Sequence, residues 1–216
     1  IPVEIFERNI ISLKPGDKVD LDELTIKLIS MGYERVSTVE GIGQFAIRGG
    51  IIDLYSIDLE GAARIELFDD GIDSLRTFDI VSQRSVDRLE EVRIVPAREV
   101  IYSVKRKKQI TERITADLEE YIKKIKGKNT KEYLNQLKSK IQGDVDRLKN
   151  DHYFPGIDRY IPYIIDDPST VIDYVRNDQE AVVFIDEQLR VKQRVENIIL
   201  EHNEACKSML EKGSIL

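Results

Sequence analysis

Two blocks of sequence decide the fold: GQFAIRGGIIDLY at residues 43–55 and RIELFDDGIDSLRTFD at residues 64–79. In both blocks apolar side chains recur at every second position, as Ile65 and Leu67 do in the second block. A period of two is typical of strands that bury one face and expose the other. The two blocks therefore predict a β-rich domain.

Turn residues separate the expected strands. Gly49-Gly50 allows a bend or bulge between two of them. At Asp69-Asp70-Gly71 we expect a tight hairpin turn, in which the glycine supplies a positive φ beside a turn-forming aspartate. The expected strands are residues 33–39, 44–48, 51–55, 64–68, 72–78 and 93–95, with residues 10–13 as a further candidate.

A helix is expected before these strands. Asp20 stands at its N-cap and Glu23 at N3, which is the spacing of a reciprocal capping arrangement. Gly32 is expected to end the helix, since glycine readily takes the left-handed conformation that closes one. Five or six short strands and one helix indicate a compact α+β domain over residues 14–97.

The pattern changes to helices after Pro96. Residues 104–126 and 130–149 carry apolar residues at helical spacing, and Gly127-Lys128-Asn129 between them suits a helical hairpin. The remaining expected elements are a short helix at residues 171–175, a buried strand at 181–185 and a long amphipathic helix at 187–211.

The composition is typical of a soluble globular protein, with 41% hydrophobic and 34% charged residues. No apolar run approaches the roughly 18 residues that a membrane-spanning helix needs, and the N-terminus lacks a signal-peptide pattern. The single cysteine, Cys206, excludes an internal disulfide and a thiolate metal cage. We expect a cytoplasmic protein and, because the chain begins at Ile1-Pro2 without a methionine, a piece of a longer one.

The charge distribution leaves a nucleic-acid function open as an alternative. The formal net charge of −7 argues against an extensive grip on phosphates, which needs clustered lysine and arginine. Residues 105–149 nevertheless hold 14 basic and 7 acidic side chains, beginning with Lys105-Arg106-Lys107-Lys108. These lysines alternate with the apolar stripe of a helix, so an ordinary solvated helix face is the simpler interpretation.

One segment suggests catalysis. The sequence VVFIDE at residues 182–187 resembles a Walker B strand, in which Asp186 and Glu187 would face Mg²⁺ and the attacking water. That chemistry requires the phosphate-binding loop G-x-x-x-x-G-K-[ST], which the chain lacks. We interpret Asp186 and Glu187 as the end of a strand followed by acidic residues in the first turn of a helix, where they favour the helix dipole. We expect no catalytic residue, no cofactor and no metal site. A vestigial nucleotide-binding module stays as an alternative.

Three arginines of the β-rich stretch suggest a docking surface. Arg35, Arg48 and Arg64 fall in separate expected strands, and the last two lie on the polar side of the alternation. Arginine suits protein interfaces because its planar guanidinium forms directional bonds and is weakly hydrated. On composition alone, however, an ordinary solvated sheet face is the simpler interpretation.

Longer strings of residues resemble a known family. They are GYERV at residues 32–36, the two blocks quoted above, and SQRS at residues 82–85. These strings closely resemble the N-terminal module of the bacterial transcription-repair coupling factors, a module that is similar to the excision-repair helicase UvrB. The resemblance is specific over residues 32–96 and looser beyond them, where it includes residues 153–162 and 171–187.

The resemblance implies recruitment without catalysis. In that family the β-rich domain binds UvrA, the damage-recognition ATPase of nucleotide excision repair, and so brings it to lesions where RNA polymerase has stalled. The contacts similar to those that UvrB makes with UvrA fall on Arg35, Arg48, Arg64 and Glu66. Ala46 stands where UvrB has a further arginine, so one contact would be missing or replaced.

The resemblance also implies a domain plan. Residues 1–13 would end a preceding half-domain, and residues 14–97 would form the UvrA-binding domain. Residues 98–216 would form a helical hairpin and the second half of a degenerate helicase-like α/β domain with an incomplete core. The ATP-dependent DNA translocase motor and the sites for RNA polymerase and DNA would lie outside this chain. Other domains of the full-length protein would be able to mask the UvrA surface, and no membrane contact is expected.

Overall fold

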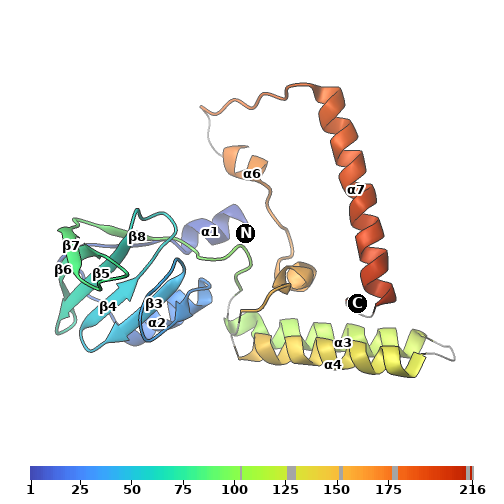
Figure 1. The fold of residues 1–216 in the computed structure, drawn as a ribbon, viewed down its shortest axis with the longest axis horizontal. Helices are drawn as coiled ribbons and strands as arrows, with labels where there is room; N and C mark the ends of the chain where they lie inside the picture. The colour runs from blue at the N-terminus through green and yellow to red at the C-terminus, as the bar shows by residue number, and fades with distance from the viewer. Residues whose placement is uncertain (103, 126–129, 151–152, 177–179, 213–214, 216) are drawn as a thin grey trace. The chain divides into compact units, whose positions relative to one another are not determined.

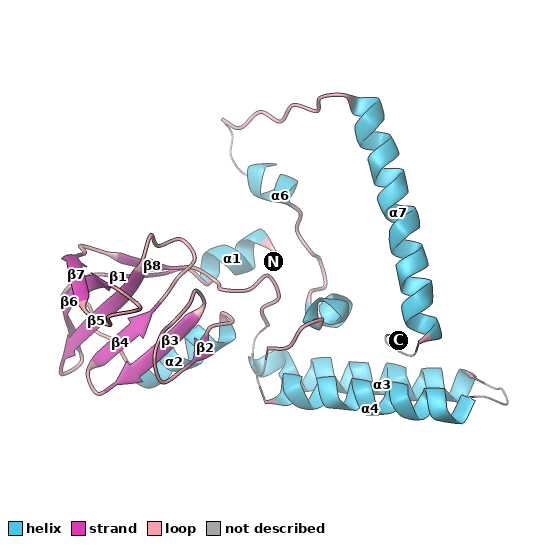
Figure 2. Ribbon diagram, viewed as in Figure 1, coloured by secondary structure: helices cyan, strands magenta, loops and turns pink. Residues whose placement is uncertain are grey.

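The computed structural model describes residues 1–102, 104–125, 130–150, 153–176, 180–212 and 215. The chain forms two compact units: Ile1–Val104 with Ile164–Ser169, and Lys105–Tyr163 with Thr170–Leu216. Within the described residues, the strands belong to the first unit and the long helices to the second (Figures 1 and 2).

A six-stranded sheet forms the centre of the first unit. Its strands, in spatial order, are β2 (Glu34–Arg35), β3 (Gln44–Arg48), β4 (Ile51–Leu54), β5 (Ala62–Phe68), β6 (Gly71–Phe78) and β7 (Ser85–Arg88). Neighbouring strands run antiparallel except β2 and β3, which are parallel. Strand β1 (Ile11–Leu13) pairs with β8 (Val92–Ile94) in a separate two-stranded sheet, and helix α1 (Val3–Arg8) precedes it.

The inner face of the six-stranded sheet carries the main core. Helix α2 (Leu21–Ser30) contributes Leu24 and Leu28 to this core. The strands contribute Phe45, Ile52, Leu54, Ala63, Ile65, Ile72 and Leu75, at alternate positions except in β6, where the pairing with β5 shifts register between Glu66 and Leu67. Because successive side chains of a strand point to opposite faces, the residues between them lie on the outer face.

Helix α2 has the ends that the sequence predicts. The Asp20 carboxylate accepts hydrogen bonds from the backbone N–H groups of Asp22 and Glu23, both at 2.9 Å. These bonds satisfy two of the N–H groups that the first turn of a helix leaves unpaired. The helix ends before Gly32, which has a φ of +87°.

Three predictions about the strands need correction. The first expected strand, residues 33–39, is reduced to the two residues of β2. Strand β7 was not predicted, because SVDR is exposed along its whole length and shows no apolar alternation. In the hairpin between β5 and β6, Asp69 and not Gly71 takes the positive φ, at 58°.

The second unit contains the predicted pair of packed helices. Helices α3 (Lys107–Lys124) and α4 (Thr130–Lys149) bury Ile110, Ile114 and Leu118 from the first and Leu137, Ile141, Val145 and Leu148 from the second. The expected connection Gly127-Lys128-Asn129 lies outside the described residues. Short 3-10 helices η1 (Val104–Arg106) and η2 (Ile157–Tyr160), helix α5 (Ile161–Ile164), helix α6 (Val171–Arg176) and helix α7 (Gln188–Glu211) complete the chain.

The predicted buried strand at residues 181–185 is wrong. These residues form no regular structure, and Val182, Val183, Phe184 and Ile185 are 54–88% exposed. A strand needs a neighbour for its backbone hydrogen bonds, and the second unit has no strand among its described residues. The regular structure among the described residues of 98–216 is therefore all helical, and no strand of the expected α/β half-domain is seen there.

The α+β fold class is confirmed, as a β-rich unit followed by helices α3 to α7. The three-part division of the chain stays a proposal. Strand β1, which that division set apart, pairs with β8 in the first unit, and Leu13 lies in the main core. None of the helices in the described ranges combines the length and the apolar character that a membrane-spanning helix requires.

Candidate docking surface

The outer face of the sheet gathers most of the predicted site residues. Cross-strand pairing forms one row from Ala46, Asp53, Arg64, Arg76 and Arg88 and a second row from Arg48, Ile51, Glu66 and Ser74. Directly paired residues share a face of the sheet, so these side chains lie next to one another. We call Arg48, Ile51, Asp53, Arg64, Glu66, Phe68 and Arg76 the docking face.

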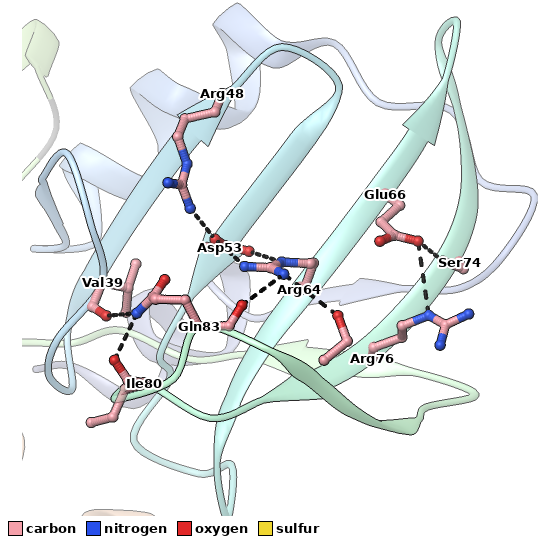
Figure 3. Close-up of polar contacts among 10 residues, drawn as sticks. Val39, Arg48, Asp53, Arg64, Glu66, Ser74, Arg76, Ile80 and Gln83 are labelled. Carbon is pink, nitrogen blue, oxygen red and sulfur yellow. Dashed lines mark hydrogen bonds and ion pairs between the residues drawn. The ribbon is translucent and has the colours of Figure 1, made fainter.

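Asp53 is the centre of the docking face. Its side chain is only 1% exposed, yet its carboxylate bonds with two arginines. Arg64 donates from Nε to Oδ1 at 2.7 Å and from Nη2 to Oδ2 at 2.9 Å, and Arg48 donates from Nη2 to Oδ2 at 2.9 Å (Figure 3). A buried carboxylate is costly unless it is paired and hydrogen-bonded, and this one is paired twice.

Arg64 is less exposed than Arg48 and makes more contacts within the domain. Its side chain is 14% exposed, whereas that of Arg48 is 51% exposed. Nη1 of Arg64 donates to the carbonyl of Gln83 at 3.2 Å, and its guanidinium lies 4.8 Å from the ring centre of Phe78. The hydrogen bond to Asp53 raises the pKa of Arg64 above its ordinary value, because it stabilises the charged form.

The connection between β6 and β7 is fixed by its own side chains. Gln83 has a φ of +59°, and its Nε2 donates to the carbonyls of Ile80 at 2.7 Å and Val39 at 3.2 Å (Figure 3). Asp79 accepts a hydrogen bond from the backbone N–H of Ser82 at 2.7 Å, and the bonds from Ser82 lower the pKa of this carboxyl. The loop therefore presents the Gln83 carbonyl to Arg64 in a defined position.

A second, smaller core lies on the outer face beside these groups. It contains Val39, Ala46, Ala62 and Phe78. Ala46 is 1% exposed, so the position at which UvrB is expected to carry a further arginine is covered here. A small side chain at this position fits the cover that Val39 and its loop provide.

Glu66 lies in the second row and has two polar neighbours. Ser74 Oγ donates to Oε2 of Glu66 at 2.5 Å, and Nε of Arg76 lies 3.8 Å from the same oxygen (Figure 3). Arg76 is absent from the predicted site. The alternation of the second block places Arg76 on the polar side of its strand, and this could have identified it. In the structure Arg76 pairs with Arg64.

Arg35 is separated from the other predicted site residues. It lies on β2 at the edge of the sheet and pairs with Phe45, whose side chain is in the main core. A paired residue shares the face of its partner, so Arg35 projects from the inner side of the sheet edge. The structure brings Arg48, Arg64 and Glu66 onto one face and does not bring Arg35 to it.

Two apolar side chains extend the docking face. Phe68 at the end of β5 is 82% exposed, and Ile51, which pairs with Glu66, is 37% exposed. The alternation of the second block already places Phe68 on the same side as Arg64 and Glu66. An exposed aromatic residue beside arginines has the composition of an interface centre.

Asp186 and Glu187 precede helix α7, with Glu187 at its N-cap, so they lie neither at the end of a strand nor in the first helical turn, contrary to the expectation from the sequence. The carboxylate of Asp186 accepts a hydrogen bond from the Glu187 backbone N–H at 2.8 Å, and Glu187 pairs with Arg190 at 2.5 Å. In the part of the chain that the structure describes, no group of three or more metal-ligating side chains is found. The basic residues of α3 include Lys108 and Lys124, which pair with acids one turn away.

Residues 11–100 match the family model of the UvrB interaction domain. Over 215 residues the chain is 34% identical to the transcription-repair-coupling factor of Bacillus subtilis (strain 168), an alignment that covers 100% of this chain and 18% of the relative. It is 36% identical over 219 residues to that of Staphylococcus aureus (strain MRSA252), which covers 99% of this chain and 18% of the relative. The chain thus spans about a fifth of the length of these relatives. With the β-rich unit matched to that domain and the whole chain aligned to these proteins, the chain belongs to the transcription-repair coupling factor family, in a segment that contains the UvrB interaction domain.

Proposed function

We propose that the docking face binds UvrA and recruits it to lesions at which RNA polymerase has stalled, and that this chain takes part without catalysis. The observation that carries the proposal is the pair of arginines held by Asp53 on an exposed sheet face. One of them, Arg48, remains 51% exposed and directs its guanidinium along that face. Membership of the family and the match to the UvrB interaction domain support a repair protein as the partner.

The chemistry of the docking face suits a protein partner. Exposed apolar groups, Ile51 and Phe68, lie among charged groups that are already partly ordered by internal bonds. Interfaces obtain most of their binding free energy from a few arginine and aromatic residues near their centre. Arg48 and Phe68 meet that description, and Glu66 is positioned to accept a bond from a donor on the partner.

Titration of the 216-residue chain with purified UvrA tests the proposal. Arg48→Glu is expected to weaken binding by about 2 kcal/mol or more, roughly 30-fold, because it reverses an interface charge and places a second carboxylate beside Asp53. Thermal unfolding of the variant should shift by a few degrees at most, because Arg64 still bonds both carboxylate oxygens of Asp53. Equal affinities of the parent chain and Arg48→Glu for UvrA would contradict the proposal.

Two further charge reversals serve as comparisons. Arg93→Glu changes an exposed strand residue of β8, outside the six-stranded sheet, and is expected to leave the affinity unchanged. Arg35→Glu is expected to have a smaller effect than Arg48→Glu, because Arg35 lies at the edge of the sheet. Binding of duplex DNA with a steep salt dependence, insensitive to Arg48→Glu, would instead favour the DNA-binding alternative.

A further inference from the structure

The two arginines on Asp53 use their hydrogen-bond donors differently. A guanidinium is a planar fork of N–H donors and has no acceptor. Arg64 directs Nε and Nη2 to Asp53 and Nη1 to the Gln83 carbonyl, so each of its nitrogens donates within the domain. Its planar face lies over Phe78. Little of Arg64 is left for a partner.

Arg48, in contrast, uses few of its donors within the domain. Among the contacts of the described residues, its guanidinium is bonded through Nη2 to Asp53. Its Nε and Nη1 remain available, and half of the side chain is exposed. The bond to Asp53 orients the guanidinium before a partner arrives, which reduces the entropy that binding would otherwise remove from a long side chain.

The charge of Asp53 poses a question about the docking face. If the arginines attracted the partner only as positive charges, a carboxylate between them would weaken the attraction, since it cancels one of the two charges. Asp53 is also too buried, at 1% exposure, to contact a partner itself. Its position makes sense if the geometry of Arg48 matters more than the net charge of the face.

Building on the proposed function, we propose that Asp53 and Arg64 are positioning residues and that Arg48 is the arginine that bonds the partner. Asp53 orients Arg48, and Arg64 joins Asp53 to the loop at residues 79–85. The acceptor on the partner is a carboxylate or a carbonyl that fits the remaining N–H groups of Arg48.

Asp53→Asn separates positioning from simple charge attraction. The change removes a negative charge from the docking face, so attraction alone predicts equal or tighter binding to UvrA. Positioning predicts weaker binding, by about five- to tenfold, because Arg48 loses its ionic anchor. Asp87→Asn, at an exposed position of β7, removes the same charge and is expected to leave the affinity unchanged. Tighter or unchanged binding of Asp53→Asn would overturn the proposal.

A second variant keeps the charge and changes the geometry. Arg64→Lys retains a cation beside Asp53 but has one nitrogen in place of three, so it cannot reproduce the two parallel bonds to Asp53 together with the bond to the Gln83 carbonyl. We expect a loss of affinity similar to that of Asp53→Asn. Parent-like binding by Arg64→Lys would show that the fork of Arg64 has no positioning role.

Combining variants tests whether Asp53 acts through Arg48. If it does, Arg48→Ala lowers the affinity for UvrA by a smaller factor in the Asp53→Asn chain than in the parent chain. Equal factors in the two backgrounds would overturn the proposed route. A merely destabilised chain would not produce this coupling, because each binding constant refers to folded protein.

Measurements without a partner distinguish failure of this inference from failure of the proposed function. In the parent chain, the Arg64 Nε–H is expected to give a protected ¹⁵N NMR signal, and the hydrogen-bonded amides of Ser82 and Gln83 are expected to exchange slowly. Both features should be lost in Asp53→Asn. If the parent chain does not bind UvrA, the proposed function fails, and unchanged spectra in Asp53→Asn would separately overturn the positioning role.

Discussion

Tyr33 connects three parts of the first unit through one hydroxyl group. The hydroxyl donates to the carbonyl of Val95 at 2.8 Å and lies 2.9 Å from Ser56 Oγ. Ser56 Oγ also accepts a hydrogen bond from the backbone N–H of Val95 at 3.2 Å. The side chain of Tyr33 is buried, and burial raises its pKa to about 12.

This tyrosine predicts a loss of stability at alkaline pH. The folded state favours the neutral phenol, so the contribution of Tyr33 is complete below its ordinary pKa of 10 and declines as the pH rises toward 12. Tyr33→Phe should cost about 1 kcal/mol at pH 8, from the lost hydrogen bond, and its deficit should shrink above pH 10. Urea unfolding of both chains between pH 8 and pH 11.5 measures the difference. A deficit that does not change with pH would contradict the prediction.

Phe68 offers a test of the docking face that does not depend on charge. Because its side chain is 82% exposed, Phe68→Ser should change the free energy of unfolding by less than about 0.5 kcal/mol. Its affinity for UvrA should fall about tenfold, through loss of apolar contact area with the partner. Ile26→Ser, at a 60% exposed position of α2 away from the docking face, is the matched control for both measurements. Equal affinities of the Phe68 and Ile26 variants would count against this role.

At the scale of elements, the turn that ends α2 requires a glycine at position 32. The Gly32 N–H donates to the carbonyl of Ile29, and the Tyr33 N–H donates to that of Leu28, both at 3.0 Å. This pattern is a Schellman motif, which requires a positive φ at Gly32. A Cβ atom at this position would lie 2.4 Å from Cγ of Arg98.

Gly32→Ala should therefore destabilise the first unit by about 2 kcal/mol. The left-handed backbone costs roughly 1 kcal/mol for a residue with a Cβ, and the crowding at Arg98 adds to it. Gly41→Ala is the matched control, because Gly41 has no positive φ and an added Cβ would meet no atom within 4 Å. Urea unfolding of both variants measures the effect, and equal midpoints would contradict the steric argument.

The elements differ in how well the sequence predicts them. Helix α2 and the hairpin of β5 and β6 were predicted because their periodicity and their turn residues agree. Strand β7 was missed because its four residues are exposed on both faces and are held by pairing with β6. Residues 182–185 were wrongly predicted as a strand, since an apolar run does not specify which neighbour it will pair with.

The residues of the docking face also differ in how well the sequence predicts them, depending on whether a local pattern or a distant neighbour determines their position. Alternation in the two blocks was enough to place Arg48, Arg64 and Glu66 on one face. The assignment of Arg35 depended on its neighbour in space, which no local pattern encodes. The role of Gln83 was also hidden, because its side chain bonds to Val39, 44 residues earlier in the chain.

At the scale of the whole molecule, the two units differ in how completely they bury their apolar residues. The first unit has two defined cores. In the second unit, residues 182–185 and several apolar residues of α7, among them Leu189 and Leu200, are exposed. Such a surface binds hydrophobic dyes and favours association between chains.

Phe184→Ser should reduce that surface without a loss of stability. Phe184 is 88% exposed, so its replacement removes apolar area from water contact and leaves the described packing unchanged. We expect lower fluorescence of the dye ANS and less aggregation on heating, with a melting temperature within about 1 °C of the parent chain. Val81→Ser, at an 88% exposed position in the first unit, controls for the loss of a single exposed apolar group. A clear drop in melting temperature would show that Phe184 is packed in solution.

The two edge strands of the sheet have a further consequence. Strand β2 is only two residues long, and β7 carries Asp87 and Arg88 on an irregularly paired edge. Short and charged edges discourage the addition of a strand from another chain. These edges therefore favour a partner that binds the exposed face through side chains over one that extends the sheet by backbone pairing. Complexes formed in this way should dissociate more readily as salt is added, because salt screens the attraction between charged side chains across the contact.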